Sequence, residues 1–209
     1  MRFLEIAASK QRGLNWDAVR DVKMPGVMVY DMRDLPMRGV KDKTYSGVYN
    51  EHFIEHLTKE EGINFLKEML RVMKPFGTIR TIWPPMEFVE WLRQEEDLDN
   101  HPWVKHYYQF YVVKHKFAPK GTEFMRMQDQ CAEGIMWQGG EHKHIWGKQE
   151  LIDTMKEIGY INVREKKYQE SGLPAFKNID TPGDIRAFHS AVIEAQSPAE
   201  QKRQMELDL

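Results

Sequence analysis

Residues 44–84 constrain the fold of this chain more than any other segment, because they read as a strand, a helix and a second strand. Residues 45–49 are rich in strand-forming side chains, and polar Asn50 and Glu51 follow them. Thr58 can cap the next element, whose apolar side chains recur at helical spacing. Those side chains are Ile63, Leu66, Met69, Leu70 and Met73. We therefore expect a helix with one buried face.

The end of this helix forms a corner that starts the second strand. Lys74 suits the negative end of a helix, Pro75 cannot continue it, and Gly77 permits a turn. Residues 78–83 then read as a strand. A strand, a helix and a strand within about forty residues predict a right-handed parallel crossover. The fold class is therefore α/β with a mostly parallel sheet, and such sheets bind ligands beyond the carboxyl ends of their strands.

The same segment resembles the class I S-adenosylmethionine (SAM)-dependent methyltransferases, in particular the small group described as predicted SAM-dependent methyltransferases. The motifs EHxxEH and RVLKPGG of that group correspond to residues 51–56 and 71–77. The other matching stretches are residues 4–9 (first strand and glycine-rich loop), 14–17 (second strand), 27–32 (third strand), 142–146, 149–158 (last helix) and a sixth strand ending at Lys167. The resemblance implies a Rossmann-like sheet, SAM as the cofactor and methyl transfer as the reaction.

The glycine-rich loop of that family is degenerate in this chain. Ala7, Ala8 and Ser9 stand where glycines let the backbone approach the cofactor closely. About half a dozen residues separate the first two expected strands, whereas a parallel crossover usually needs a dozen or more. We therefore expect a trimmed N-terminal lobe. The main alternative to a methyltransferase is a non-catalytic relic of the fold that serves as a binding or assembly protein.

The chain is expected to form one domain with an insertion. Residues 1–196 make up the methyltransferase-like domain, residues 85–146 interrupt it after the fifth strand, and residues 197–209 form a charged C-terminal tail. The insertion is rich in aromatic residues and histidines, and both of its ends lie at the carboxyl edge of the sheet. We expect it to cover that edge, although an exposed aromatic surface would equally suit a homodimer interface.

Residues at the expected strand ends are the candidates for cofactor binding. These candidates are Glu5, Ala7, Asp17, Asp31, Met32 and Asn50. Asp17 is expected to close the second strand, where an acid can accept hydrogen bonds from ribose hydroxyls; the alternative is a solvated turn residue. The resemblance places Asp31 and the backbone N–H of Met32 beside adenine and Asn50 beside the methyl group. Asp31 and Asn50 could instead cap turns.

Four residues are the catalytic candidates, namely Glu51, His52, His142 and His144. An imidazole titrates near neutral pH, so one of the histidines could deprotonate a hydroxyl or amine acceptor. We expect the insertion to bring His142 or His144 near Glu51 and His52. The alternative is that a histidine hydrogen-bonds a backbone carbonyl and holds the insertion in place. The acceptor implied is a small molecule or a saccharide.

Residues 52–56 also match H-x-x-E-H, the inverted zinc-protease motif. In that motif His52 and His56 would bind zinc and Glu55 would act as the base, which gives a third alternative, a zinc hydrolase. The preceding strand and the following corner already explain the segment, and no downstream glutamate is marked as a third ligand. We therefore expect no bound metal.

Composition and net charge limit the classes of partner that we expect for this chain. The net charge of −2 gives no global field that would attract nucleic acid. The single cysteine, Cys131, excludes an intramolecular disulfide, and no apolar run is long enough to span a bilayer. With no recognisable targeting segment, we expect a cytoplasmic protein with a small-molecule substrate.

Overall fold

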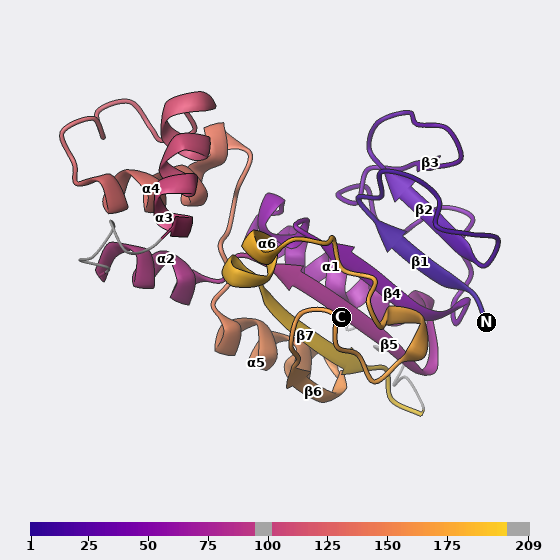
Figure 1. Cartoon of the computed structure of the whole chain (residues 1–209). Helices are drawn as coiled ribbons and strands as arrows, with labels where there is room; N and C mark the ends of the chain where they lie inside the picture. The colour runs from indigo at the N-terminus through magenta and orange to yellow at the C-terminus, as the bar shows by residue number, and fades with distance from the viewer. Residues whose placement is uncertain (95–101, 200–209) are drawn as a thin grey trace, which may run out of the picture.

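The computed structural model describes residues 1–94 and 102–199, and within them the chain forms a sheet of seven strands (Figure 1). The strand order is β3-β2-β1-β4-β5-β7-β6, and β7 runs antiparallel to both of its neighbours while the other pairs are parallel. The strands are β1 (Phe3–Ile6), β2 (Trp16–Arg20), β3 (Met28–Val29), β4 (Tyr45–Glu51), β5 (Met73–Trp83), β6 (Ile161–Glu165) and β7 (Ala191–Gln196). This confirms the predicted α/β class and the Rossmann-like topology.

The α-helices are α1 (Lys59–Val72), α2 (Met86–Gln94), α3 (Pro102–Tyr107), α4 (Met127–Trp137), α5 (Lys148–Ile158) and α6 (Asp184–His189). The shorter turns are the 3₁₀ helices η1 (Ile54–His56), η3 (Gln138–Gly140) and η4 (Pro174–Phe176) and the π-helix η2 (Tyr108–Lys114). The predicted cap of α1 is confirmed, because the side chain of Thr58 accepts from the backbone N–H of Glu61 while the Glu61 carboxylate accepts from that of Thr58.

The main hydrophobic core lies between one face of the sheet and the helices α1 and α5. Its strand residues include Leu4, Ile6, Val48 and Ile79, and its helix residues include Phe65, Leu66, Met69, Leu151 and Met155, all almost fully buried. Burying a side chain of this size contributes roughly 1.5–3 kcal/mol. The central parallel strands are therefore held firmly, and their carboxyl ends are fixed in space.

The opposite face of the sheet is covered without the helix that would normally follow β1. Residues 7–15 join β1 to β2 without a helix, which confirms the predicted trimmed lobe. The connection between β6 and β7 crosses this face instead (Figure 1). Its Phe176 is fully buried, with ring centroids 6.0 Å from Phe3 and 6.1 Å from Tyr49. The connection thus supplies apolar cover that a crossover helix would otherwise give.

Two of the predicted strands were placed wrongly. The second strand begins at Trp16 instead of at Leu14, whose side chain is fully exposed in a turn that the Trp16 N–H closes on the carbonyl of Gly13. Ala18 and Val19 are the buried residues that pair with β1. The third strand keeps two residues of the predicted 27–32, because a turn starts at Asp31. Asp17 therefore lies near the amino end of β2 and not at its carboxyl end.

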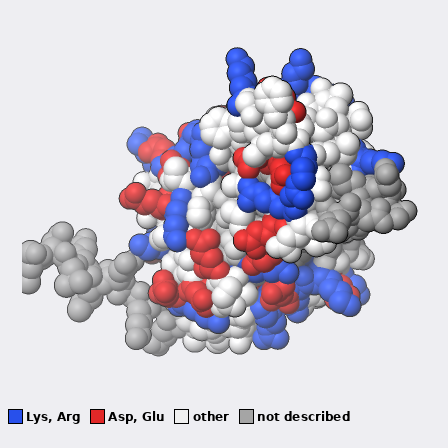
Figure 2. All heavy atoms as spheres, turned by 90° about the vertical axis from the view of Figure 1, so that its left-hand side faces the viewer, with Lys and Arg blue, Asp and Glu red and all other residues white. Residues whose placement is uncertain are grey.

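The insertion after β5 forms a small helical lobe beside the sheet (Figure 1). Its helices α2, α3 and α4 with η2 enclose a second core. The buried members of that core are Phe88, Val89, Leu92, Val104, Tyr107, Cys131, Ala132, Ile135 and Ile145. The face of the molecule that Figure 2 shows bears basic and acidic side chains close together.

The end of the domain and the tail meet at Ser197. This residue is fully buried, and its N–H donates to the carbonyl of Gly77 at 2.9 Å. The expected tail therefore begins with a residue that belongs to the folded sheet, and residues 200–209 lie outside the described part. Among the helices of the described residues, none combines the length and the apolarity needed to cross a bilayer.

Candidate active site

The topological switch point of the sheet lies between β1 and β4. The chain runs outward from β1 to β2 and β3 and then returns to form β4 on the other side of β1, so that Ile6 pairs with Asn50. Both strands are followed by a non-glycine residue in the left-handed region, Ala7 with φ 58° and His52 with φ 50°. Backbone strain of this kind clusters at ligand sites.

The side chain of Glu5 reaches the switch point from β1, and its carboxylate is paired with the guanidinium of Arg12. Arg12 Nε donates to Glu5 Oε2 at 2.8 Å, and the guanidinium lies 5.2 Å from the centroid of the Tyr49 ring. Burial raises the pKa of Glu5, and the hydrogen bond from Arg12 opposes that rise. The loop after β1 begins with small side chains. It leaves no open space there, however, because Ala8 is buried against Ala18. A cation thus already occupies the position beside Glu5.

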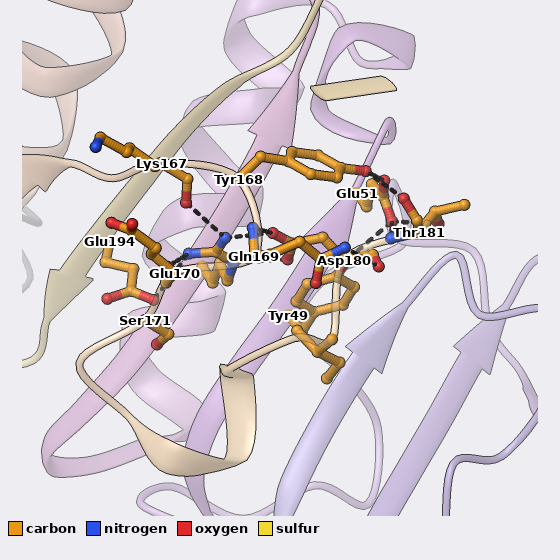
Figure 3. A network of polar contacts seen from close by, with 12 residues as sticks. Tyr49, Glu51, Lys167, Tyr168, Gln169, Glu170, Ser171, Asp180, Thr181 and Glu194 are labelled. Carbon is orange, nitrogen blue, oxygen red and sulfur yellow. Dashed lines mark hydrogen bonds and ion pairs between the residues drawn. The ribbon is translucent and has the colours of Figure 1, made fainter. Parts of the chain in front are cut away.

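Glu51, at the end of β4, holds the β6–β7 connection in place (Figure 3). Its Oε1 accepts a hydrogen bond from the Tyr168 hydroxyl at 2.6 Å, and its Oε2 accepts from the Tyr49 hydroxyl at 2.8 Å and from the Thr181 hydroxyl at 2.6 Å. Burial alone would raise the pKa of Glu51, but these hydrogen bonds outweigh it and leave the pKa below its ordinary value. Both oxygens of Glu51 are therefore engaged in hydrogen bonds, two of which come from the β6–β7 connection.

Replacing Glu51 with Gln should lower the free energy of unfolding by about 1–2 kcal/mol at neutral pH, because an amide offers one acceptor oxygen where the carboxylate offers two. The pKa of Glu51 is lower in the folded chain than in the unfolded one. Its stabilisation is therefore complete above the ordinary value of 4.5 and is lost as the pH falls through the folded value. Urea unfolding of both proteins should show the deficit shrink on acidification. A deficit of unchanged size in acid would contradict this pH dependence.

The remaining cofactor candidates fall in different places. Asp31 follows β3 and forms a bidentate pair with Arg33, whose hydrogen bonds lower the pKa of the carboxyl group. Met32 is buried in the main core. Asn50 is fully buried, and its amide nitrogen donates to the Thr81 hydroxyl at 3.0 Å. Of these three residues, only Asp31 presents its polar group to solvent.

Asp17 does not lie at the carboxyl edge, which corrects the sequence-based expectation. Its carboxylate accepts from Arg2 at 3.1 Å and from the Tyr45 hydroxyl at 2.8 Å, near the amino ends of β1 and β4. The acidic residue that follows the carboxyl end of β2 is Asp21, which is exposed. The N–H of Ala8 bonds to the carbonyl of Val19, so the loop after β1 runs beside this end of β2.

A cavity of about 450 Å³ lies between the turn after β4 and the insertion. It is lined by His52, Glu55, His56, His106, Tyr107, Phe110, Tyr111, Phe117, Gln138, His142, Arg186 and His189. The returning end of the insertion is fixed to the turn, because the N–H groups of Lys143 and His144 both bond to the carbonyl of Glu55, at 2.8 and 3.3 Å. The cavity therefore has one wall from the sheet and one from the insertion.

The structure brings His142, but not His144, to His52. His142 lines the same cavity as His52, whereas His144 points away and approaches the Glu150 carboxylate at 3.2 Å. Glu51 does not line the cavity. Its Oε1 atom lies 4.0 Å from the guanidinium of Arg186, which does line it. His142 and His52 thus line one cavity, whereas His144 lies beside Glu150 of α5.

Burial keeps two of the cavity histidines, His52 and His142, neutral. It lowers the pKa of His52 to about 3, assisted by the charge of Arg186, and it lowers the pKa of His142 to about 4. The Nε2 atom of His52 lies 3.0 Å from the Ser190 hydroxyl. A neutral imidazole offers a lone pair that can accept a proton or hydrogen-bond an acceptor group.

Several residues of the site were not found from the sequence. Arg12, Arg186 and His189 come from loops or a short helix, where no periodicity marks them. Asp21 was missed because the second strand was placed too early. Glu55 was noticed only within the zinc-protease pattern, but His52 precedes the short η1 turn, so the two motif histidines do not share a face of an α-helix. Glu55 and His56 instead lie beside His142, in a cluster that does not include His52.

No protein-family model and no curated protein matches the sequence. Solved structures match it in fold. A SAM-dependent methyltransferase from Archaeoglobus fulgidus superposes with a TM-score of 0.53 at 15% identity, over 93% of this chain and 85% of that one. The CurJ carbon methyltransferase gives a TM-score of 0.50 at 11% identity, over 94% of this chain and 48% of that longer chain.

A third solved structure is a 1,6-didemethyltoxoflavin-N1-methyltransferase from Burkholderia thailandensis, which contains bound S-adenosylhomocysteine (SAH). It matches with a TM-score of 0.48 at 11% identity, over 94% of this chain and 70% of that one. At 15% and 11% identity, the likeness to the first two structures concerns the fold. The chain thus has the fold of the class I SAM-dependent methyltransferases.

Proposed function

We propose that this chain is a SAM-dependent methyltransferase that binds SAM at the switch point between β1 and β4. The observation that carries the proposal is the left-handed backbone of Ala7 and His52, at the adjoining ends of these two strands of a class I fold. Strained residues at a topological switch point are expected where a ligand is bound. His52 also lines the cavity, so it lies where a cofactor site and an acceptor site would meet.

The acceptor in this proposal is the hydroxyl or amine of a small molecule or saccharide in the cavity. A volume of about 450 Å³ suits a small ligand. Tyr107, Phe110 and Tyr111 offer aromatic surface for a ring, and neutral His52 can hydrogen-bond and orient a hydroxyl of the acceptor. Methyl transfer from a sulfonium is an in-line displacement, so alignment of the two reactants supplies much of the catalysis.

A non-catalytic relic of the fold is the second candidate, and one observation favours it. The Glu5 carboxylate pairs with Arg12 at 2.8 Å, and the adjacent residues 7–9 are Ala, Ala and Ser where the family has glycines. If Arg12 fills the space of the cofactor permanently, the sheet serves only as a scaffold for the β6–β7 connection and the helical lobe.

Calorimetric titration of the purified chain with SAH separates the two candidates. A methyltransferase should bind one SAH per chain, whereas adenosine triphosphate, which shares the adenosine moiety but carries a triphosphate, should bind far more weakly. Absence of heat at millimolar SAH would favour the scaffold. If SAH binds, transfer of a tritiated methyl group from SAM to a panel of sugars and small amines then identifies the acceptor class.

A further inference from the structure

We propose that Glu55, His56 and His142 bind a divalent first-row transition-metal ion at the wall of the histidine cavity. One ligand atom from each residue lies within 4.8 Å of the other two, so small side-chain rotations would let one ion reach all three. The inference rests on these residues and not on SAM binding. It therefore stands or falls separately from the proposed function.

The carboxylate of Glu55 is the first reason for the inference. Its side chain is fully buried, and within residues 1–94 and 102–199 neither of its oxygens has a hydrogen-bond partner, although Nδ1 of His52 lies 3.3 Å from Oε1. Three other buried glutamates have an arginine as ion-pair partner, unlike Glu55. Glu5, Glu68 and Glu194 each pair with an arginine. His52 is neutral, so Glu55 has no arginine or other cation among its described contacts. A buried carboxylate without a cationic partner is costly, and a metal ion between it and the neighbouring imidazoles would remove that cost.

The tautomer of His142 is the second reason. Its Nδ1 lies 2.5 Å from the carbonyl oxygen of Ile135, and because a carbonyl can only accept, Nδ1 must carry the proton. The lone pair is therefore on Nε2. Histidines that bind metals typically donate their other ring N–H to a carbonyl or carboxylate in this way, which fixes the ring. The ring of His56 stands at 88° to that of His142, with centroids 4.8 Å apart.

The third reason is that the site is built before any ion arrives. The N–H groups of Lys143 and His144 bond to the carbonyl of Glu55, so the backbones that carry Glu55 and His142 are joined. Two imidazole nitrogens and one carboxylate oxygen suit Zn²⁺, Fe²⁺ or Co²⁺ better than the hard cation Mg²⁺. Three protein ligands leave coordination positions open, and those positions face the cavity, where water or an acceptor oxygen could bind.

The test uses the full chain without a histidine tag, stripped with a chelator and titrated with Co²⁺. We expect one Co²⁺ per chain, with visible absorption bands and a rise in melting temperature. Glu55→Gln and His142→Gln should each weaken Co²⁺ binding at least tenfold. The matched control is His144→Gln, which removes a histidine two residues away that contacts Glu150 instead, and it should bind Co²⁺ as the unaltered chain does.

A second readout covers the case in which a variant is poorly folded. Gln has nearly the size of Glu, so the metal-free Glu55→Gln variant should melt no lower than the metal-free parent, while Co²⁺ should raise only the melting temperature of the parent. Failure of the folded parent to bind millimolar Co²⁺, or equal binding by all three variants, would overturn the proposal. SAH titration of the same samples reports on the methyltransferase proposal independently.

Discussion

Replacing Arg80 with Met should lower the free energy of unfolding by about 3–5 kcal/mol, because removal of one partner from a buried ionic network leaves the other charges uncompensated. Arg80 lies in the middle of β5 and is fully buried. Its Nε donates to Asp180 at 2.8 Å, and one terminal nitrogen lies 3.0 Å from Glu194. Met fills a similar volume, so the loss would report on charge and not on a void.

The same arginine also joins parts of the chain that are distant in sequence. It donates to the carbonyl oxygens of Lys167 and Glu170, at 3.3 and 2.8 Å, and so fixes the start of the β6–β7 connection onto β5 (Figure 3). That connection covers the sheet face that lacks a crossover helix. We therefore expect Arg80→Met to loosen the connection as well as to destabilise the fold.

Urea unfolding followed by circular dichroism measures this effect. The matched control is Arg164→Met on the edge strand β6, where the side chain is exposed, and it should change stability by no more than about 0.5 kcal/mol. A free energy of unfolding for Arg80→Met within about 1 kcal/mol of the parent would show that the network contributes little to stability.

Replacing Asp21 with Ala should weaken SAH binding by about 2–3 kcal/mol, or roughly 30- to 150-fold, because the carboxylate would lose two hydrogen bonds to ribose hydroxyls. Asp21 follows the carboxyl end of β2, next to the loop after Ala7, where acidic residues of nucleotide-binding sheets bind ribose. The prediction rests on the proposed function.

Asp17→Ala is the control for Asp21→Ala, and the pair tests the position of the site. Asp17 binds Arg2 and Tyr45 near the opposite edge, so its loss should lower stability slightly and leave SAH affinity unchanged. Calorimetric titration of both variants with SAH measures this difference in affinity. Weakened binding in Asp17→Ala with unchanged binding in Asp21→Ala would place the cofactor elsewhere.

Much of the fold was predictable because its central elements carry local signals. The cap at Thr58 and the helical spacing that follows each specify structure within a few residues, and the structure confirms α1 and the strands on either side of it. The strand β5 begins at Met73, earlier than the predicted 78–83, so Pro75 and Gly77 lie within it. The edge strands lack such signals. Leu14 suggested a strand by its side chain, yet burial of Val19 against the core decides the register.

The candidate site was predictable only where it lies close to those central elements. Glu51 ends β4 and His52 follows it directly. His142, which the insertion was expected to bring near both, lines the same cavity as His52 but not Glu51. The β6–β7 connection could not be foreseen, because its course depends on the burial of Phe176 and on ion pairs to Arg80 across about a hundred residues of chain. Arg186 and His189 lie on the same connection, in α6, so their positions in the cavity depend on the same contacts between distant parts of the chain.

A crystal structure grown with millimolar SAH tests the central claim most directly. We expect SAH at the carboxyl edge between β1 and β4, with its sulfur toward His52, its ribose at Asp21 and Arg12 displaced from Glu5. Such a structure would place the donor beside the histidine cavity, as methyl transfer requires. Crystals in which SAH is absent while Arg12 still binds Glu5 would contradict the claim and identify the sheet as a scaffold.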